Sequence, residues 1–261
     1  MCVLFIAWQV HPDYPLVIAA NRDEYFARST APLSQWRELP IAAGRDLEAG
    51  GTWFGMSTSG RIAGVTNVRR PDLVKPHQSS RGELPVKYLA DTLTDAAFQT
   101  WLSTHHQHYN PFNLLFGTVN QLWVFNSLST RIEPLTQGFY SISNGVLEDI
   151  WPKMARGTQA LTNYIKNIKS LDTEELMELL HDSTRAPIEQ LPNTGVASSL
   201  EYWLSSIFIP PAAFPNGLYG TRSSTVLLCG KSAFQAIEYT YNSDGLVTNS
   251  AQLSITIPTI L

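Results

Sequence analysis

Short apolar runs separated by turn residues fill the first part of the chain. Residues 2–9 and 16–20 are two such runs, joined by a turn-rich segment that holds two prolines. Runs of this length bounded by turn residues predict two adjacent β-strands. Residues 52–56 and 61–66 form a second pair, and their short Ser/Thr/Gly link predicts a β-hairpin. The stretch between the two pairs, up to about Ala49, is expected to be irregular.

Apolar positions at helical spacing occur in four later segments. Residues 83–92 and 94–107 carry apolar side chains at about the spacing of one helix face. Residues 151–168 and 173–182 repeat the pattern, and Asp172 precedes the last segment as a capping residue. All four segments are therefore predicted to be helices.

Strand patterns lie on either side of the later helices. The predicted strands are residues 113–119, 121–127, 139–142, 224–229 and 234–241, the last two forming a hairpin. Residues 183–218 are rich in Pro, Ser and Asn, so they are expected to loop over the surface.

The order of these elements indicates the fold class. Strands come first, helices lie in the middle and strands return, which suits antiparallel sheets with helices packed outside them. A βαβ fold would instead alternate strands and helices. Because the chain has no internal repeat, linker or shift in composition, residues 1–261 are predicted to form one α+β domain.

Composition narrows the function classes. The chain is 44% hydrophobic and 15% charged, which supplies a substantial core and argues against disorder. Its net charge is −4 and it has no basic stripe, so nucleic acid is not an expected partner.

Membrane spans and secretory signals would each show a characteristic apolar pattern in the sequence. No run approaches the roughly 18 apolar residues of a membrane span. The apolar start lacks a basic region and a cleavage pattern, and the two cysteines, Cys2 and Cys229, suit a reducing compartment. A cytoplasmic protein is therefore expected.

Cys2 is the first candidate for chemistry. Methionine aminopeptidase removes an initiator methionine that precedes a small residue, so Cys2 could become the mature N-terminus. Such a residue offers a thiol nucleophile and an α-amine whose pKa of about 7.7–8.0 suits a general base. The alternative is a small apolar cysteine that fills a buried strand. Cys229, in an apolar run, is interpreted in this second way.

Four polar residues, Asn21 to Glu24, directly follow the apolar run 16–20. If the first two strands pair as a hairpin, these side chains lie near Cys2. Arg22 would then lower the pKa of the thiol, and Asp23 would hold the α-amine. An ordinary strand exit with a salt bridge is the alternative interpretation.

A histidine cluster offers a weaker candidate site. His105, His106 and His108 fall in a polar stretch near a predicted helix end. Since metal sites usually draw ligands from more than one element, no metal is expected there.

Several motifs spread along the chain resemble one family. They are Met1-Cys2, Ala19-Ala20-Asn21-Arg22-Asp23-Glu24, Gly50-Gly51-Thr52-Trp53-Phe54-Gly55, Ala63-Gly64-Val65-Thr66-Asn67, Arg81-Gly82-Glu83-Leu84, Phe112-Asn113-Leu114, Ser143-Asn144-Gly145, Trp151-Pro152-Lys153 and Tyr219-Gly220-Thr221-Arg222. On these motifs the chain resembles the family named for its Asn-Arg-Asp-Glu motif, the transport-and-Golgi-organisation-protein-2-like proteins.

A more distant resemblance carries the chemistry. The order of motifs is similar to that of bile salt hydrolases and penicillin V acylases, N-terminal-cysteine amidases with a four-layer αββα fold of two mostly antiparallel sheets. This resemblance implies a nucleophile at Cys2 and partners at Arg22, Asp23, Asn67, Asn144 and Arg222. The Asn144 side chain and the backbone at Asn67 would bind the oxyanion. The spacing around Arg22 departs from that of the amidases, because here Asn21 precedes the arginine.

Two functions follow from these resemblances. The first is cleavage of a linear C–N amide bond in a small molecule through a Cys2 thioester, with no cofactor. The second is a carrier that keeps the fold without turnover and handles haem, lipid or acyl-CoA. The 11% aromatic content and residues 183–218 could form an apolar groove for such a ligand. A purely structural role would leave the polar residues after the buried strands without a purpose.

Overall fold

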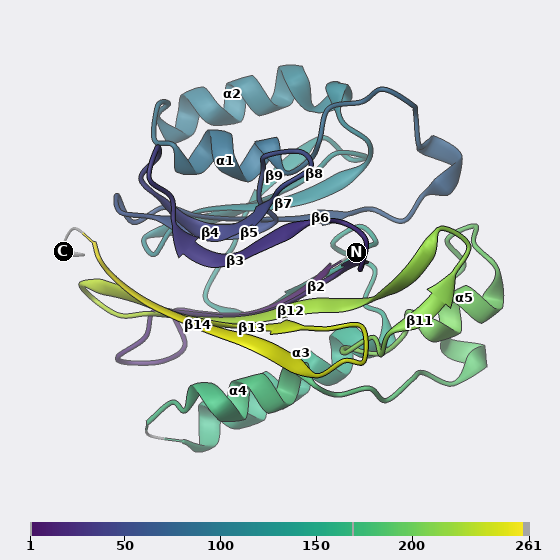
Figure 1. Ribbon diagram of the computed structural model, residues 1–261. Coiled ribbons are helices and arrows are strands. Elements are labelled where there is room, and N and C mark those ends of the chain that lie inside the picture. Colours follow the sequence, from purple (N-terminus) through teal and green to yellow (C-terminus); the bar gives the residue numbers. More distant parts are fainter. Residues whose placement is uncertain (1, 169, 258–261) are drawn as a thin grey trace.

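Two antiparallel sheets packed face to face form the centre of the molecule. The computed structural model describes residues 2–168 and 170–257. Within these residues each sheet has seven strands, and helices cover the outer face of each sheet (Figure 1). The predicted α+β, four-layer αββα arrangement is therefore confirmed. The expected removal of Met1 concerns a residue outside the described ones.

The first sheet combines strands from the first and the last parts of the chain. Its strand order is β10-β1-β2-β12-β13-β14, with β11 paired to β12. The strands are β1 (Cys2–Trp8), β2 (Leu16–Tyr25), β10 (Gly138–Ile142), β11 (Ala212–Phe214), β12 (Gly217–Cys229), β13 (Ala233–Tyr241) and β14 (Val247–Thr256). β1 is thus an interior strand, paired with β10 on one side and β2 on the other.

The second sheet follows the order of the chain. Its strands are β3 (Thr30–Gln35), β4 (Ile41–Asp46), β5 (Phe54–Ser57), β6 (Ile62–Asn67), β7 (Phe112–Thr118), β8 (Gln121–Asn126) and β9 (Arg131–Pro134). The two sheets meet at one edge, where β14 lies beside β3.

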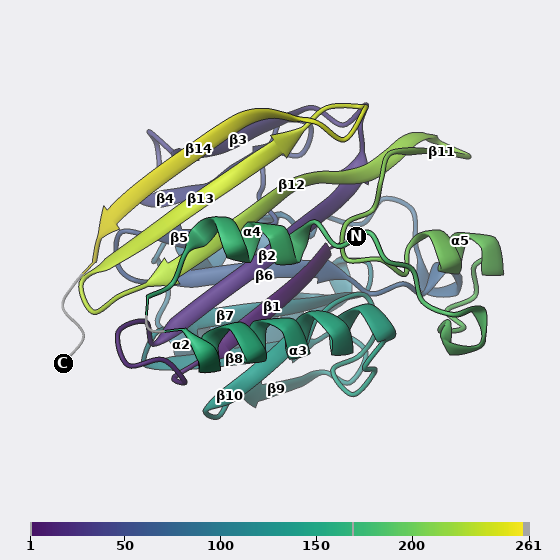
Figure 2. The same ribbon diagram turned by 90° about the horizontal axis from the view of Figure 1, so that it is seen from below.

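Helices form the two outer layers. The second sheet is covered by α1 (Glu83–Leu89) and α2 (Asp95–His105), and the first by α3 (Pro152–Asn167) and α4 (Thr173–Leu180). Shorter helical elements are α5 (Ser198–Trp203), η1 (Pro71–Leu73), η2 (His106–His108) and η3 (Ile188–Gln190). Figure 2 shows α3 crossing β1 and β10, while α4 crosses β2 and β12. No helix in the described part of the chain is long and apolar enough to cross a membrane.

The apolar run of β1 is continuous because both of its faces are buried. Leu4 and Ile6 pack between the two sheets, whereas Val3 and Phe5 pack against the outer helices α3 and α4. Successive side chains of a strand point to opposite faces, so an interior strand with two covered faces has no polar positions. Complete burial of each such side chain contributes roughly 1.5–3 kcal/mol.

Gly157 sets how closely α3 approaches the sheet. A Cβ atom at this position would lie 2.2 Å from ring carbons of Phe5 on β1. Only a glycine allows so short a separation, and the helix therefore lies directly on the strand. Lys153 lies about one turn earlier in α3. The same close approach brings it near Asp23 of β2, so that their charges interact.

Most of the predicted elements are confirmed, but edge strands and one predicted loop differ. β3 and β4 lie in the stretch expected to be irregular. The segment 183–218, expected to loop over the surface, instead contains η3, α5, β11 and the start of β12, and its Leu204, Ile207 and Ile209 are buried. β9 and β14 were not predicted either. β3, β9 and β14 lie at or beside sheet edges and carry mostly exposed or partly exposed residues. They therefore lack the apolar signal on which strand prediction depends.

Candidate active site

The pairing of β1 with β2 places Arg22 directly opposite Cys2. Residues directly opposed in an antiparallel pair have their side chains on the same face of the sheet. Here that face is the one turned toward the second sheet, and Cys2 packs partly against the core between the sheets. The predicted proximity of Cys2 and Arg22 is confirmed.

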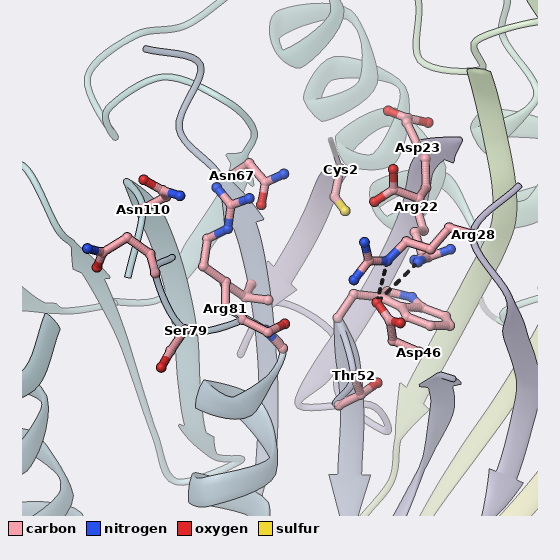
Figure 3. A pocket seen from close by; sticks show the side chains of 16 residues that line it. Cys2, Arg22, Asp23, Arg28, Asp46, Thr52, Asn67, Ser79, Arg81 and Asn110 are labelled. Carbon is pink, nitrogen blue, oxygen red and sulfur yellow. Dashed lines mark hydrogen bonds and ion pairs between the residues drawn. The ribbon is translucent and has the colours of Figure 1, made fainter. Parts of the chain in front are cut away.

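Cys2 opens into a polar cavity of about 330 Å³ at the end of the sandwich. Residues from both sheets and from the segment that precedes α1 line it (Figure 3). Those that carry charge or an amide include Arg22, Glu24, Arg28, Asp46, Asn67 and Arg81. The cavity therefore presents one thiol among several charged groups.

Asp46 holds two of the arginines on one side of the cavity. Its Oδ2 accepts a hydrogen bond of 2.6 Å from Arg28 Nε and lies 3.9 Å from an Arg22 guanidinium nitrogen. Although burial opposes it, the hydrogen bond from Arg28 lowers the pKa of Asp46. Arg22 is also stacked over the Trp53 ring at 4.4 Å and donates to Thr30 Oγ1. Its guanidinium is consequently fixed in place.

The pKa of the Cys2 thiol is raised above its usual value. Burial is the main cause and the Asp23 carboxylate adds to it, whereas Arg22 and the Asp23 backbone amide lower the pKa. The sequence predicted that Arg22 would lower the thiol pKa. Arg22 acts in that direction, but burial outweighs it, so the thiol is protonated at neutral pH.

Asp23 belongs to a buried layer of charge beneath the strand end. Its Oδ1 accepts a 2.8 Å hydrogen bond from Thr221 Oγ1. Burial raises the pKa of Asp23 and Lys153 opposes the rise. Lys153 is 1% exposed and donates to the Leu204 carbonyl. Burial lowers the pKa of Lys153 to about 8, although Asp23 opposes the shift. Asp23 itself lines the cavity, and the buried Lys153 ammonium lies close enough for the two charges to interact.

The alternation of β2 gives its four polar residues different tasks. Arg22, Asp23 and Glu24 line the cavity. The Asn21 side chain bonds instead to the opposite layer, donating to the carbonyls of Leu180 at 2.8 Å and Ile207 at 3.0 Å. Asn21 therefore anchors the segment after α4 and takes no part in the cavity.

Asn67 and Asn144 are brought together beside Cys2. The Asn144 side-chain amide donates to the Asn67 carbonyl at 3.0 Å, and Ser143 Oγ donates to the Cys2 carbonyl at 3.2 Å. Asn67 lines the cavity, while Asn144 is completely buried behind it. The structure thus joins the ends of β1, β6 and β10. That either asparagine binds an oxyanion stays a prediction.

Arg222 does not line the Cys2 cavity but lies next to it, since it shares a small neighbouring cavity with Arg22 and Trp53. Its Nη1 donates to the carbonyls of Tyr25, Phe26 and Arg28, at 3.0, 3.1 and 3.2 Å. The guanidinium therefore fixes the turn after β2, and Arg222 is not among the residues that line the cavity. Arg222 stands at a bulge in β12 where the strand register shifts, and its expected role in the site stays a prediction.

Three charged cavity residues were not predicted from the sequence. Arg28 and Asp46 come from the stretch expected to be irregular, and Arg81 directly precedes α1. The Arg81-Gly82-Glu83-Leu84 motif is one of those that carry the family resemblance, but nothing in its pattern places it opposite Cys2. Lys153 likewise belongs to a motif whose position only the packing of α3 reveals.

The histidine cluster has a packing role in the structure. His105 stacks on Trp101 with ring centroids 4.8 Å apart, and His106 Nδ1 lies 3.0 Å from the Ser103 carbonyl. Among residues 2–168 and 170–257, no group of three His, Cys, Asp or Glu side chains is placed to hold a metal ion.

Comparison with known sequences places the chain among relatives of similar length. The model of the family described as Transport and Golgi organisation 2 matches residues 1–243. The Transport and Golgi organization 2 homolog of Mus musculus is 30% identical over 244 residues, covering 87% of this chain and 88% of that protein. The Drosophila melanogaster Transport and Golgi organization protein 2 is 24% identical over 257 residues, covering 87% of each.

Comparison with solved structures concerns the fold. Two structures of the conjugated bile acid hydrolase from Clostridium perfringens align with TM-scores of 0.53 and 0.54, at 10% and 9% identity. The first alignment covers 98% of this chain and 92% of the hydrolase, and the second 100% and 98%. The chain therefore shares the fold of the N-terminal-nucleophile hydrolases.

Proposed function

This chain belongs to the Transport and Golgi organisation 2 family, and we propose that it is an N-terminal-nucleophile amidohydrolase whose nucleophile is the Cys2 thiol. The observation that carries the proposal is the position of Cys2. The residue begins an interior strand, opens into a polar cavity and faces an arginine fixed by Asp46. One of the hydrolase structures with the same fold is of the mutant C2A, so that enzyme also has a cysteine at position 2.

The proposed reaction begins once Met1 is removed and the Cys2 α-amine is free. The amine takes the thiol proton, and the thiolate sulfur attacks the carbonyl carbon of a linear amide. The C–N bond then breaks, the departing amine takes the proton, and water hydrolyses the thioester. Because the thiol is protonated at neutral pH, the adjacent amine is needed as the base.

The surrounding residues have supporting roles in this proposal. Asp23, with Lys153 behind it, would hold the α-amine in position. The backbone at Asn67, which the buried Asn144 amide holds in place, would stabilise the oxyanion by about 2.7–4 kcal/mol. Arg22 would hold the substrate on the thiol side of the cavity.

The test begins with the intact mass of the purified protein. Protein that lacks Met1 should hydrolyse at least one member of a panel of N-acyl amides. Cys2→Ala should lower the rate by at least about 10³-fold. Cys229→Ala should keep the rate, because Cys229 is a buried core residue with a pKa raised by burial to about 12. Absence of turnover by protein with a verified free Cys2 would refute the proposal.

A second cavity favours a second candidate function, ligand carriage without turnover. It has a volume of about 460 Å³ and lies at the edge of the sandwich beside β9, β10 and α3. Its apolar lining includes Val124, Leu135, Phe139, Ile142, Leu147 and Ala155. An apolar cavity of this size suits a lipid, an acyl chain or part of a haem.

Titration with haem, followed by the Soret band, tests this carrier function. Saturable binding at low micromolar concentration is expected, and Ala155→Trp should abolish it by filling the cavity. Ala160→Trp is the matched control, since Ala160 is exposed on the same helix and does not line the cavity. Absence of saturable binding, or equal loss in both variants, would count against the haem carrier.

A further inference from the structure

Arg81 lies across the Cys2 cavity from the other two arginines. Figure 3 shows its guanidinium group beside Asn67, with Cys2 between it and the pair Arg22 and Arg28. The residue comes from the second sheet's side, immediately before α1. The cavity is therefore enclosed by positive groups on two opposite sides.

The backbone that carries Arg81 is tightly held. The Thr52 amide donates to the Gly82 carbonyl at 3.1 Å. A Cβ atom at Gly51 would lie 2.5 Å from the Gly82 carbonyl carbon, so the two segments are in direct backbone contact. This contact fixes the base of the Arg81 side chain relative to the cavity floor.

The charges of the three arginines are balanced differently. Asp46 accepts from Arg28 and lies within ion-pair distance of Arg22, and Arg28 also lies 3.6 Å from Glu48. Arg81 Nη1 donates to the Pro111 carbonyl at 3.2 Å. Within the described residues no carboxylate oxygen lies within 4.0 Å of Arg81.

Burial of the Arg81 charge with so few partners is energetically unfavourable unless a further anion binds. A guanidinium has five N–H donors, and the protein uses one of those of Arg81. Burial lowers the pKa of Arg81 and Arg28 adds to the shift, whereas Glu24 and Cys2 oppose it without cancelling it, so the charged form is incompletely compensated. The planar fork of an arginine matches the two oxygens of a carboxylate.

We propose that Arg81 binds a carboxylate group of the ligand that occupies the Cys2 cavity. One incompletely compensated positive charge matches one negative charge. A dianion such as a phosphate monoester would also face Glu24 and Asp46, which line the same cavity. The substrate class, which rests on the proposed hydrolase function, is therefore N-acylated amino acids rather than neutral amides. The carboxylate site itself does not depend on turnover.

Two thiol reagents of nearly the same shape test the site directly. Iodoacetate carries a carboxylate and iodoacetamide is neutral, and in both the thiolate sulfur forms a bond to carbon while iodide leaves. The ratio of their rates at Cys2 cancels any change in thiol reactivity. The full chain is used on a Cys229→Ala background, at low salt because screening weakens charge effects, and alkylation is followed by intact mass.

Arg81→Gln should lower the iodoacetate-to-iodoacetamide ratio by about tenfold, and Arg81→Lys should restore part of it. Lys87→Gln is the matched control, because it removes the same charge from α1 at a residue that does not line the cavity. An unchanged ratio in Arg81→Gln, or an equal fall in Lys87→Gln, would overturn the proposal.

A ligand experiment on the unsubstituted Arg81 site covers the case in which Arg81→Gln does not fold. N-acetylglycine should protect Cys2 from iodoacetamide, whereas N-acetylglycinamide, which lacks the negative charge, should not. Equal protection by the two compounds, or none by either, would overturn the carboxylate site. Failure of the hydrolase assay would leave both of these measurements unaffected, so the two proposals fail separately.

Discussion

A buried ion pair between Arg69 and Glu201 makes the effect of one substitution calculable. Arg69 follows β6 and Glu201 lies in α5, and their side chains are 6% and 3% exposed. Glu201 Oε1 also accepts from the Thr194 amide at 3.0 Å, and Arg69 is stacked on the Trp151 ring. The pair therefore fastens α5 to the end of the sandwich that contains the cavity.

Glu201→Gln preserves the shape of the side chain but removes its charge. Removal of one partner from a buried ion pair costs about 3–5 kcal/mol, because the other charge remains in a medium of low polarity. A domain of this size loses about 2–4 °C of melting temperature per kcal/mol, so the melting temperature should fall by about 6–20 °C. This loss is large against a typical total stability of about 5–15 kcal/mol.

Urea denaturation followed by tryptophan fluorescence measures the loss in the free energy of unfolding. Asp72→Asn is the control, because it breaks the exposed pair that Asp72 forms with Arg70, the residue next to Arg69. Its midpoint should match that of the wild type. The double variant Arg69→Met with Glu201→Met should recover much of the loss, since apolar residues leave no uncompensated charge. A Glu201→Gln midpoint equal to that of Asp72→Asn would refute the reasoning.

Two further predictions concern stability. Glu238 accepts hydrogen bonds from the Leu33 amide and Thr225 Oγ1, and burial raises its pKa from 4.5 to about 7. Stability relative to Glu238→Gln should therefore be greatest below about pH 4.5 and fall by roughly 3 kcal/mol as the pH rises through 7; a flat difference in urea midpoints from pH 4.5 to 8 would contradict this. Gly157→Ala should destabilise the fold by about 1–3 kcal/mol, because its Cβ would collide with Phe5. A gain of about 1 kcal/mol in thermal unfolding, as at an exposed helix position, would show that α3 is not held against β1.

The predictable part of the fold is its interior. β1, β2 and the β5–β6 hairpin have apolar runs because helices or a facing sheet cover them, and such runs are visible in the sequence. β14 carries mostly exposed residues and pairs with β13 through its backbone. Backbone pairing leaves no trace in side-chain type, so strands of this kind are invisible to hydrophobic patterning.

The site was predictable only where it depends on local pairing. Cys2 meets Arg22 through a hairpin of neighbouring strands, which the sequence predicts. Asp23 meets Thr221 across 198 positions, and Lys153 reaches this layer through the packing of α3. The exact position of Arg222 was not predictable for a related reason. A bulge between Thr221 and Ser223 interrupts the alternation of β12, and no sequence pattern marks it.

The strand order of the two sheets also sets a sequence of events during synthesis. The second sheet pairs strands in chain order, so it can form as the ribosome delivers them, whereas β1 waits for β10 and β2 waits for β12, which ends at Cys229. At about 5–20 residues per second, that interval lasts roughly 10–45 s. β1 can pair with β2 early, but the pair lacks its outer neighbours until β10 and β12 have been made. Enzymes that trim the nascent N-terminus have this interval in which to act before β1 takes its place in the sheet.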